Sequence, residues 1–453
     1  MSLHRLPPPV LLIASFAAAI LLGAILLVLP LSARGEPLAP LEALFTATSA
    51  VCVTGLTVVD TGTRLSGFGQ GVVLVLVQAG GLGIMTFAVF TALLLGRQIT
   101  FRDRLVIQDS LHHSPTAELK KLVRYILGFT LLLEATGAAL LAARFAREMP
   151  LGRAVYAGVF HAVSAFCNAG FALFPDSLTR YRADPAVNLV VSVLVVSGGL
   201  GFLVNMELRD RLLARVRGRT MGSLSLHSRL TLAVTGALLV VGFLGILALE
   251  WGNLLAGLSL GERVLAAWFQ GMTPRTAGFN TLDYGRATSA TLLLTSMLMF
   301  VGASPGSTGG GIKTTSLGLI AVLLVARWRG QGRAFAFNRT VPTAVMDRAL
   351  TLTALAAILL SVAVLGLVVL EQGSRPFDAA MVRFLPILFE AVSAFGTVGL
   401  STGITAGLTP GGKVVLIGLM FLGRVGPLTV ALAAGRRRRP GHFRYAEEPV
   451  MVG

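Results

Sequence analysis

The chain has 453 residues, of which 54% are hydrophobic and only 13% are charged, and its mean hydropathy is +0.79. Soluble domains carry roughly a quarter charged residues, so a cytosolic enzyme, a disulfide-stapled secreted module and a disordered scaffold are excluded. The net charge of +17 would indicate nucleic acid in a soluble protein, but in a membrane protein Lys and Arg collect in cytoplasmic loops. The two cysteines are too few for a disulfide framework, and the six histidines show no metal-ligand spacing.

The first apolar run, residues 10–31, is long enough to cross a hydrocarbon layer roughly 30 Å thick. A cleaved signal peptide is the alternative, because Ser32 and Ala33 supply small residues before Arg34, but its apolar stretch usually has only ~7–15 residues. We therefore predict a retained spanning helix. Seven more long apolar runs follow, at about 70–96, 122–143, 186–206, 229–250, 290–325, 349–370 and 411–435.

Taken in pairs, the eight runs enclose four shorter stretches, at about 41–58, 155–172, 262–280 and 383–402. The helical part of each is too short to span a membrane, and each stretch ends in a turn that contains glycine. Irregular backbone at membrane depth persists only where it is buried in protein or lines a water-filled cavity. These stretches are predicted to be re-entrant helices.

The four short stretches match one another in sequence. In each, an aromatic residue stands ten positions before a glycine, and Leu or Phe follows that glycine. The aromatic residues are Phe45, Phe160, Trp268 and Phe389, and the glycines are Gly55, Gly170, Gly278 and Gly399. Matched contexts at a nearly constant period indicate an internal repeat. The predicted fold class is an all-α polytopic membrane protein with four tandem helix–pore loop–helix repeats, at 1–96, 97–206, 207–325 and 326–453, around a pseudo-fourfold pore.

The distribution of basic residues predicts the topology. Segments 97–124, 207–229, 326–348 and the basic tail 436–444 hold more than half of the 38 Lys and Arg residues. Eight spans place these segments and both termini on one side, which the positive-inside rule makes cytoplasmic. The four glycine turns are then expected toward the outside.

Four such units can aim their re-entrant helices at one axis. The C-terminal helix ends carry partial negative charge, which favours a cation, and the backbone before each glycine can present carbonyl oxygens that replace a cation's hydration shell. Glycine suits a turn with unusual backbone angles. The predicted lining is Val53, Thr54, Gly55, Asn168, Ala169, Gly170, Thr276, Ala277, Gly278, Thr397, Val398 and Gly399. Four tight helix-packing turns are the alternative.

Acidic residues follow three of the glycines: Asp60, Asp176 and Asp283. An outer acidic ring would concentrate cations by steering. The fourth unit has no counterpart, and lone exposed carboxylates remain the other interpretation.

The run 290–325 is interrupted by a polar, glycine-rich segment between Gly302 and Lys313. A phosphate-binding loop is rejected, because Ile312 stands where that motif requires lysine. The segment is predicted to be a polar loop inside the membrane beneath the third glycine turn, with a kinked helix as the alternative. Arg424 lies within the last run, and an intramembrane charge is usually functional; snorkelling to the cytoplasmic surface is the alternative. Small residues would make the loop mobile, and Lys313 would add a positive charge near the ion path. The residues concerned are Gly302, Ser304, Pro305, Gly306, Ser307, Thr308, Gly309, Gly310, Gly311, Lys313 and, in the last run, Arg424.

Three further residues lie close to the predicted lining. Cys52 and Cys167 occupy equivalent positions in the first and second units, and they are expected to be small packing residues behind the turns. Arg275 is expected to have a structural hydrogen-bonding role rather than direct contact with the ion.

The pore segments Thr54-Gly-Leu, Asn168-Ala-Gly-Phe, Arg275-Thr-Ala-Gly-Phe and Thr397-Val-Gly-Leu resemble those of the Trk/Ktr/HKT superfamily of potassium transporters. The resemblance covers essentially the whole chain. Because the chain starts directly at the first pore unit, it is most similar to the Ktr membrane subunit (KtrB-like).

The resemblance implies potassium uptake across the cell membrane, with the Gly302–Lys313 segment as an intramembrane gate loop. The loop residues named above and Arg424 are therefore the predicted gate. It implies a homodimer with one pore in each protomer, and a cytosolic nucleotide-binding regulatory ring (KtrA-like) as partner. Potassium is then the substrate, no cofactor is expected in this chain, and sodium dependence stays open. In some plant members a serine at the first filter glycine accompanies sodium permeability, so Gly55 favours potassium.

Two other functions are less consistent with the sequence. A carrier with alternating access, sodium-coupled or less selective among monovalent cations, would be favoured by inverted repeats, whereas these repeats run in the same orientation. A polytopic membrane enzyme is disfavoured, because the sequence has no paired intramembrane carboxylates, His cluster or nucleophile–base motif.

Overall fold

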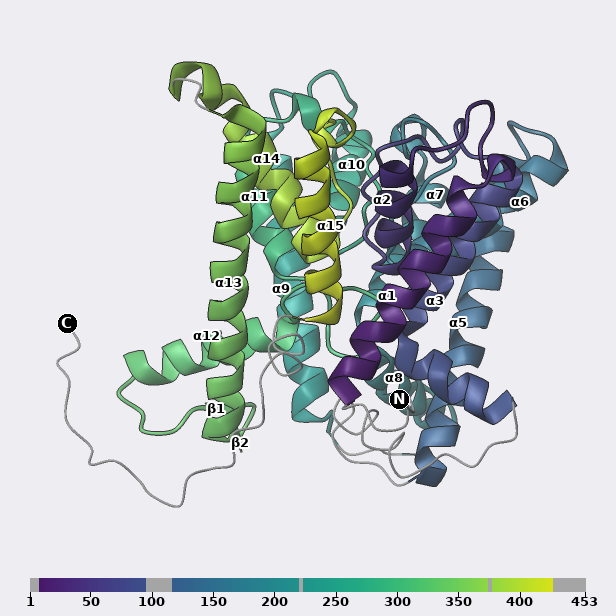
Figure 1. The fold of residues 1–453 in the computed structure, drawn as a ribbon. Helices are drawn as coiled ribbons and strands as arrows, with labels where there is room; N and C mark the ends of the chain where they lie inside the picture. Colours follow the sequence, from purple (N-terminus) through teal and green to yellow (C-terminus); the bar gives the residue numbers. More distant parts are fainter. Residues whose placement is uncertain (1–7, 95–115, 220–222, 374–376, 427–453) are drawn as a thin grey trace.

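The computed structural model describes residues 8–94, 116–219, 223–373 and 377–426 (Figure 1). Most of the predicted loop at 97–124 and all of the basic tail at 436–444 lie outside these residues. The α-helices are α1 (Pro8–Val28), α2 (Pro40–Val51), α3 (Gly67–Leu94), α5 (Thr116–Phe145), α6 (Leu151–Phe166), α7 (Pro185–Gly199), α8 (Phe202–Val216), α9 (Leu226–Leu249), α10 (Leu260–Met272), α11 (Ser289–Phe300), α12 (Thr314–Trp328), α13 (Thr343–Gln372), α14 (Phe377–Gly396) and α15 (Pro410–Val425). Short 3-10 turns are η2 (Pro30–Ser32), η3 (Thr179–Tyr181), η4 (Tyr284–Arg286) and η5 (Thr405–Gly407).

The helices follow one another in four sets of the same order. A long helix (α1, α5, α9 or α13) is followed by a shorter one (α2, α6, α10 or α14), then by a turn, and then by a further helix. The described parts of α2, α6 and α10 are mostly buried toward their C-terminal ends. The C-terminal ends of these helices therefore lie inside the protein rather than at its surface.

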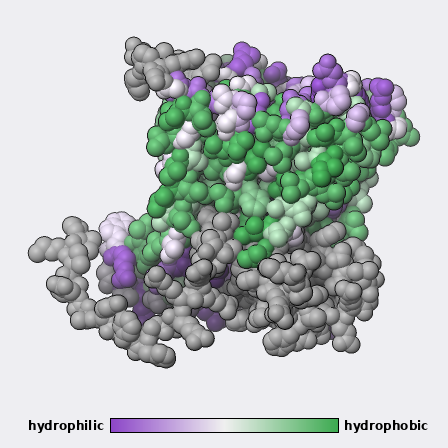
Figure 2. Space-filling view, viewed as in Figure 1, coloured by the Kyte–Doolittle hydropathy of each residue, from purple (hydrophilic) through white to green (hydrophobic). Residues whose placement is uncertain are grey.

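The long helices carry large apolar side chains on the outside of the molecule. Leu131 and Leu132 on α5 are 63% and 64% exposed, and Val362 and Leu365 on α13 are 64% and 65% exposed. Figure 2 shows hydrophobic side chains covering the middle of one face, with hydrophilic side chains along its upper edge. Exposed apolar surface on this scale is what a lipid-facing surface requires, and the chain is a membrane protein.

Among the described residues, three helices are long and apolar enough to cross a membrane, at Val123–Phe145, Leu226–Leu249 and Thr343–Gln372. The pair α7 and α8 gives a fourth if it is counted as one span, although its two parts are bent by 109°. Shorter apolar helices lie at Ile13–Val28, Gly67–Gly83, Ser289–Phe300, Thr314–Trp328 and Phe384–Gly396. The count of eight spans stays a prediction.

In every set a glycine or a loop interrupts or directly follows the helix after the turn, whereas only the third interruption was predicted. Gly83 breaks α3 with φ 75°, Gly201 separates α7 from α8 with φ 88°, and Gly426, with φ 90°, directly follows α15. The expectation of a continuous helix over 186–206 is therefore wrong. The left-handed region is accessible to glycine at no steric cost, and apolar composition alone does not reveal that the backbone turns there.

The third set contains a longer break. Helix α11 ends at Phe300 and α12 begins at Thr314, so residues 301–313 form a loop and not a kinked helix. The loop closes on itself where Val301 pairs with Ile312 and where Ala303 N–H donates to the Gly310 carbonyl at 3.2 Å.

The all-α prediction needs one small correction. Two short strands, β1 (Phe335–Ala336) and β2 (Arg339–Thr340), pair antiparallel between α12 and α13. Phe337 and Asn338 both have positive φ, which a two-residue hairpin turn requires.

Side-chain caps hold the N-terminal ends of three helices that follow the turns. Asp184, Thr288 and Thr409 are the N-caps of α7, α11 and α15, and each side chain accepts backbone N–H groups of the first turn. Glu250, which directly follows α9, accepts from Thr288 N–H at 2.8 Å, and Glu371 on α13 accepts from Thr409 N–H at 2.9 Å. In the third and fourth sets the long helix thus holds the start of the helix that follows the turn.

Candidate functional site

The backbone after each short helix repeats the same conformation four times. The residue two before each glycine has a left-handed φ: Val53 56°, Asn168 58°, Thr276 65° and Thr397 49°. The glycines also have positive φ: Gly55 88°, Gly170 69°, Gly278 79° and Gly399 91°. Left-handed φ at non-glycine residues is uncommon, so its occurrence at one position of all four turns shows that the turns share one geometry.

The four turns contact one another in a closed order. A methyl group built on Gly170 would lie 2.7 Å from the Gly278 Cα, and one built on Gly278 would lie 2.6 Å from the Val398 carbonyl oxygen. Methyl groups on Gly399 and Gly55 would overlap the carbonyl oxygens of Thr54 and Ala169. Each glycine therefore faces the turn of the next set, and we call these four glycines the glycine ring.

The carbonyl groups that precede the ring glycines all lie beside a neighbouring glycine. Ala169, Ala277, Val398 and Thr54 place their oxygens next to the positions of methyl groups on Gly55, Gly170, Gly278 and Gly399 respectively. The structure thus brings together all twelve residues of the predicted lining at one place, with backbone oxygens as its closest polar groups.

Buried hydroxyl groups hold the turns, and the sequence analysis missed them. Gly55 N–H donates to Ser49 Oγ at 3.0 Å, and Gly399 N–H donates to Ser393 Oγ at 3.1 Å. Ser164 Oγ donates to the Phe171 carbonyl at 2.8 Å, and Thr273 Oγ1 donates to the Phe279 carbonyl. The signal was available, because a serine stands six residues before three of the four glycines.

The third turn is one residue shorter than the others, which corrects the alignment of the aromatic residues. Phe269, nine residues before Gly278, is fully buried as Phe45, Phe160 and Phe389 are. Trp268 is instead half-buried, and its indole N–H donates to Ser192 Oγ at 3.3 Å. The aromatic residue of the third repeat is therefore Phe269, with Thr273 in the place of the serines.

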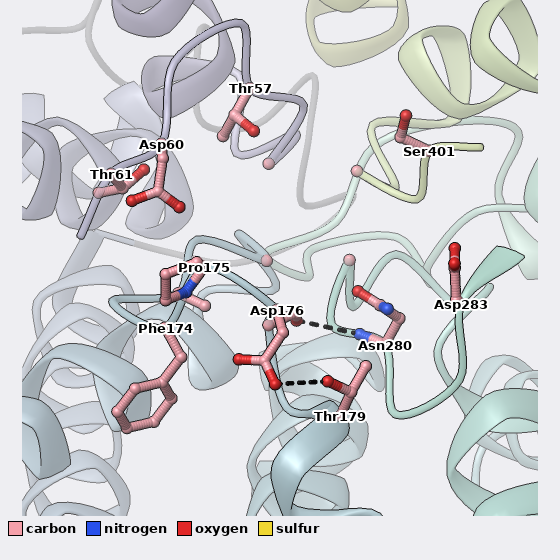
Figure 3. Close-up of a pocket in the computed structure, with 16 residues that line it drawn as sticks. Thr57, Asp60, Thr61, Phe174, Pro175, Asp176, Thr179, Asn280, Asp283 and Ser401 are labelled. Carbon is pink, nitrogen blue, oxygen red and sulfur yellow. Dashed lines mark hydrogen bonds between the residues drawn. The ribbon is translucent and has the colours of Figure 1, made fainter. Parts of the chain in front are cut away.

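A cavity of about 430 Å³ opens above the glycine ring (Figure 3). All four ring glycines line it, together with Asp60, Asp176, Asp283 and Ser401. The three carboxylates predicted to lie near the turns therefore surround one cavity, and the fourth set contributes a serine.

Each of these carboxylates also accepts hydrogen bonds from nearby residues of its own loop. Asp60 accepts from Thr63 N–H at 2.6 Å, and Asp283 accepts from Gly285 N–H at 2.9 Å. Burial alone would raise the pKa of Asp176, but hydrogen bonds from Thr179 and the charge of Arg180 hold that pKa below its ordinary value. Asp176 is therefore ionised at neutral pH.

The 301–313 loop contacts the residues that precede the ring glycines, whereas the cavity is lined by residues that follow them. Gly310 N–H donates to Thr397 Oγ1 at 2.9 Å, and Thr308 Oγ1 lies 3.1 Å from the Asn168 side-chain amide. A methyl group on Gly309 would overlap the side chain of Thr276. The loop and the cavity thus lie on opposite sides of the ring.

The helix breaks supply acceptors for this loop. A helix that ends leaves its last carbonyl groups without helical partners. Gly80, Gly198 and Gly423 each stand three residues before a break glycine, and their carbonyls accept from Arg424, Thr308 N–H and Gly311 N–H. Equivalent carbonyls of the first, second and fourth sets therefore bind the loop of the third set or the arginine attached to it.

The two predicted gate charges are both bonded to the loop. Lys313 Nζ donates to the Gly309 carbonyl at 2.8 Å, and the Arg424 guanidinium donates to the carbonyls of Thr308 and Gly80. Arg424 therefore does not reach toward the cytoplasmic surface as a snorkelling side chain would. It connects the loop to α3.

The remaining predicted neighbours have structural contacts. Cys52 and Cys167 are fully buried, and a methyl group on Gly81 would lie 2.6 Å from Cys167 Sγ. The Arg275 guanidinium donates to the Val301 carbonyl at 3.2 Å, at the start of the loop.

Comparison with known proteins places this arrangement in a family. Residues 10–438 match the model of the TrkH family, described as cation transport protein. The chain is 38% identical over 451 residues to "Ktr system potassium uptake protein B" of Bacillus subtilis, covering 99% of this chain and 97% of that one. It is 40% identical over 453 residues to "Potassium/sodium uptake protein NtpJ" of Enterococcus hirae, covering 99% and 98%.

A solved structure shares the fold. The potassium transporter TrkH from Vibrio parahaemolyticus superposes with a TM-score of 0.72 at 19% identity, covering 95% of this chain and 86% of that one. The family match over residues 10–438 and the identities to these relatives agree with this likeness. The chain belongs to the TrkH family of cation transport proteins.

Proposed function

We propose that the chain takes up potassium across the cell membrane through the glycine ring, which acts as a selectivity filter of backbone carbonyl oxygens. The observation that carries the proposal is the closed order in which the carbonyl before each ring glycine lies beside the glycine of the preceding turn, with Thr54 of the first turn beside Gly399 of the fourth. Rings of backbone carbonyls replace the hydration shell of a potassium ion, and the relatives named as potassium uptake proteins have this substrate.

The 301–313 loop is proposed to gate the path. It lies against the residues that precede the ring glycines Gly170, Gly278 and Gly399, and most of its residues, although not Gly306, are buried. Irregular backbone of this kind is tolerated in a membrane where it is buried or lines a cavity. Small residues from Gly302 to Gly311 leave the loop few side-chain contacts that would oppose its movement.

The finer architecture belongs to the same proposal. The four sets are pore repeats with boundaries near 1–96, 97–206, 207–325 and 326–453. In Figure 1, α8, α12 and the β1–β2 hairpin lie at the lower end of the molecule. This end carries many of the basic residues, so we place it on the cytoplasmic side together with both termini. A homodimer and a cytosolic nucleotide-binding regulatory ring are the proposed partners, in line with relatives named as components of a Ktr system.

A second function has one specific observation in its favour. The Enterococcus hirae relative is named a potassium/sodium uptake protein, which favours a sodium-coupled or less selective monovalent cation carrier. The transporter names of the relatives favour either form of transport over an enzyme.

Rubidium uptake into proteoliposomes tests the proposal. Purified protein is reconstituted into potassium-loaded vesicles, and uptake of tracer rubidium is measured against competing external potassium or sodium. Inhibition by potassium and weak inhibition by sodium are expected. Uptake that requires sodium, or equal competition by the two ions, would favour the carrier, and no uptake above protein-free vesicles would contradict both.

A further inference from the structure

One position of the short helices is polar in all four sets and lies next to the buried phenylalanine. The residues are Thr46, His161, Gln270 and Glu390, and each is at most 2% exposed. Polar side chains buried at this depth need hydrogen-bond partners. Neither the lining nor the loop accounts for their presence.

Three of the four accept a hydrogen bond from the same backbone position of the loop beyond the glycine ring. His161 Nε2 accepts from Leu173 N–H at 3.3 Å, Gln270 Oε1 from Thr281 N–H at 3.3 Å, and Glu390 Oε1 from Thr402 N–H at 3.0 Å. Each donor is the third residue after its ring glycine. We call His161, Gln270 and Glu390 the brace residues.

The chemistry of the brace residues differs, but their role as acceptors does not. His161 Nδ1 lies 2.8 Å from the Ala157 carbonyl, so this nitrogen carries the proton and Nε2 is free to accept. Gln270 also accepts from Leu282 N–H at 3.3 Å. Glu390 also accepts from Ser401 Oγ at 2.6 Å and from Thr405 Oγ1 at 2.8 Å. An imidazole, an amide and a carboxyl group thus each accept a backbone N–H hydrogen bond at the same position of their sets.

The first set lacks this contact. The Thr46 hydroxyl is buried and has no hydrogen-bond partner among the described residues. Its outer loop is held from α3 instead, where Gln70 Nε2 donates to the carbonyls of Thr61, Gly62 and Leu65 at 3.0–3.2 Å. Thr46 is therefore an internal control for a polar group at this position that braces nothing.

We infer that the brace residues are positioning residues for ion selectivity, and that they act by accepting a hydrogen bond rather than by their charge. In the fourth set, Ser393 Oγ accepts a hydrogen bond from Gly399 N–H, and Glu390 accepts one from the N–H of Thr402, three residues later. The glycine and its carbonyl neighbours are then fixed from both sides. The inference rests on the proposed function, because selectivity is the property that this fixing would serve.

The test uses substitutions that the chain itself suggests. Glu390→Leu and Gln270→Leu remove the acceptor, Glu390→Gln and Gln270→Glu exchange the residues of two repeats and keep it, and Thr46→Val is the matched control. We expect the leucine variants to lower the ratio of potassium to sodium competition against rubidium uptake by about tenfold, as the loss of the buried hydrogen bonds that hold one turn would allow. The exchanged variants and Thr46→Val are expected to keep the parent ratio.

Hydrogen exchange of the full-length protein gives a second readout. The leucine variants are expected to speed exchange of peptides that contain Thr281 or Thr402, and the exchanged variants are not. An unchanged ratio in folded leucine variants would overturn the inference, and so would Glu390→Gln behaving like Glu390→Leu, because charge would then be the requirement. If the leucine variants do not fold, loss of the ratio in Glu390→Gln overturns it; Gln270→Glu is less decisive, because it also removes the bond that Gln270 Nε2 donates to the Leu282 carbonyl. A parent protein without potassium preference contradicts the proposed function instead, and the exchange data still report on the braces.

Discussion

A methyl group at the glycine ring should damage selectivity through one carbonyl, and Gly399→Ala is the sharpest case. Gly399 has φ 91°, and the added Cβ would overlap the Thr54 carbonyl oxygen and lie 3.0 Å from the Gly55 Cα. The left-handed conformation costs an alanine about 1–2 kcal/mol. Relief of the overlap must also move the Thr54 carbonyl, and a binding constellation tolerates a shift of only about 0.5 Å.

Gly403 provides a matched control. Its φ is 92°, and a methyl group there would meet nothing within 4 Å. Gly399→Ala and Gly403→Ala should therefore lose similar stability to backbone strain, while only the former moves a carbonyl of the ring. Gly399→Ser and Gly55→Ser are expected to act as Gly399→Ala does, because each places a Cβ against the carbonyl of a neighbouring turn.

The assay is rubidium uptake by proteoliposomes with potassium or sodium as competitor, with thermal unfolding measured in parallel. We expect Gly399→Ala to lower the ratio of the two competitions by about tenfold, which corresponds to about 1.4 kcal/mol, and Gly403→Ala to leave it unchanged. A folded Gly399→Ala protein with the parent ratio would refute the assignment of the ring as filter. An equal loss in Gly403→Ala would show that strain alone explains the effect.

Three further predictions concern the loop, the cavity beside the glycine ring and the turns. Deletion of residues 306–310 should raise rubidium uptake strongly, because it removes the part of the loop that contacts Thr397 and Asn168; uptake at the parent level would place the gate elsewhere. Asp176→Asn should lower uptake more at low than at high ionic strength, because a steering charge is screened by salt. The pKa of Asp176 is lowered from its ordinary value of 3.8, so its carboxylate loses its charge only below that pH. The difference in uptake between the parent protein and Asp176→Asn should therefore be constant from pH 5 to 8, and a pH series of uptake checks this. Ser393→Ala should lower the free energy of unfolding by about 1–3 kcal/mol, because Gly399 N–H loses its buried acceptor, whereas Thr46→Val should change the melting temperature little.

The glycine ring was predictable because its signal is a repeat. Four glycines in matched contexts mark four turns, and glycine at such turns follows from backbone geometry. The left-handed φ at Val53, Asn168, Thr276 and Thr397 was not predictable in the same way, because these four residues share no side-chain chemistry. Their conformation is imposed by the turn, and residue type gives no sign of it.

The one-residue offset of the third repeat shows where alignment by pattern fails. Trp268 and Phe269 are adjacent aromatic residues, and matching by distance from Gly278 selected the wrong one. Burial of Phe269 and the hydroxyl bond from Thr273 identify the correct register. Counting residues back from Gly278 alone cannot show that the third repeat lacks one residue between this glycine and its aromatic residue.

The helix breaks were missed although their residues were visible. A run of apolar residues indicates a spanning helix by its composition alone. Gly83, Gly201 and Gly426 lie inside such runs, so they were predicted to be part of continuous helices. A glycine three residues earlier accompanies each of them, at Gly80, Gly198 and Gly423. The role of those carbonyls as acceptors depends on a loop from another repeat, and contacts of that range are set by tertiary structure.

Arg424 separates two explanations of how charge contributes to the gate. As an electrostatic barrier, one charge about 8 Å from a potassium ion at an effective dielectric of about 20 would oppose it by roughly 2 kcal/mol. As a connector, the guanidinium joins the loop at Thr308 to α3 at Gly80, and a planar fork with several donors is suited to this task. On both explanations Arg424→Ala raises uptake, and by less than deletion of the loop.

Arg424→Lys distinguishes the two, because it keeps the charge and removes the fork. A lysine ammonium is a point charge on a flexible stem, and it is not expected to hold both carbonyls at once. If connection is what matters, Arg424→Lys should raise rubidium uptake about as much as Arg424→Ala. If the barrier is electrostatic, Arg424→Lys should stay at the parent level while Arg424→Ala rises. We expect the first result. The Gly80 carbonyl at the break in α3 needs a hydrogen-bond donor, and Arg424 supplies it while also holding the loop at the Thr308 carbonyl.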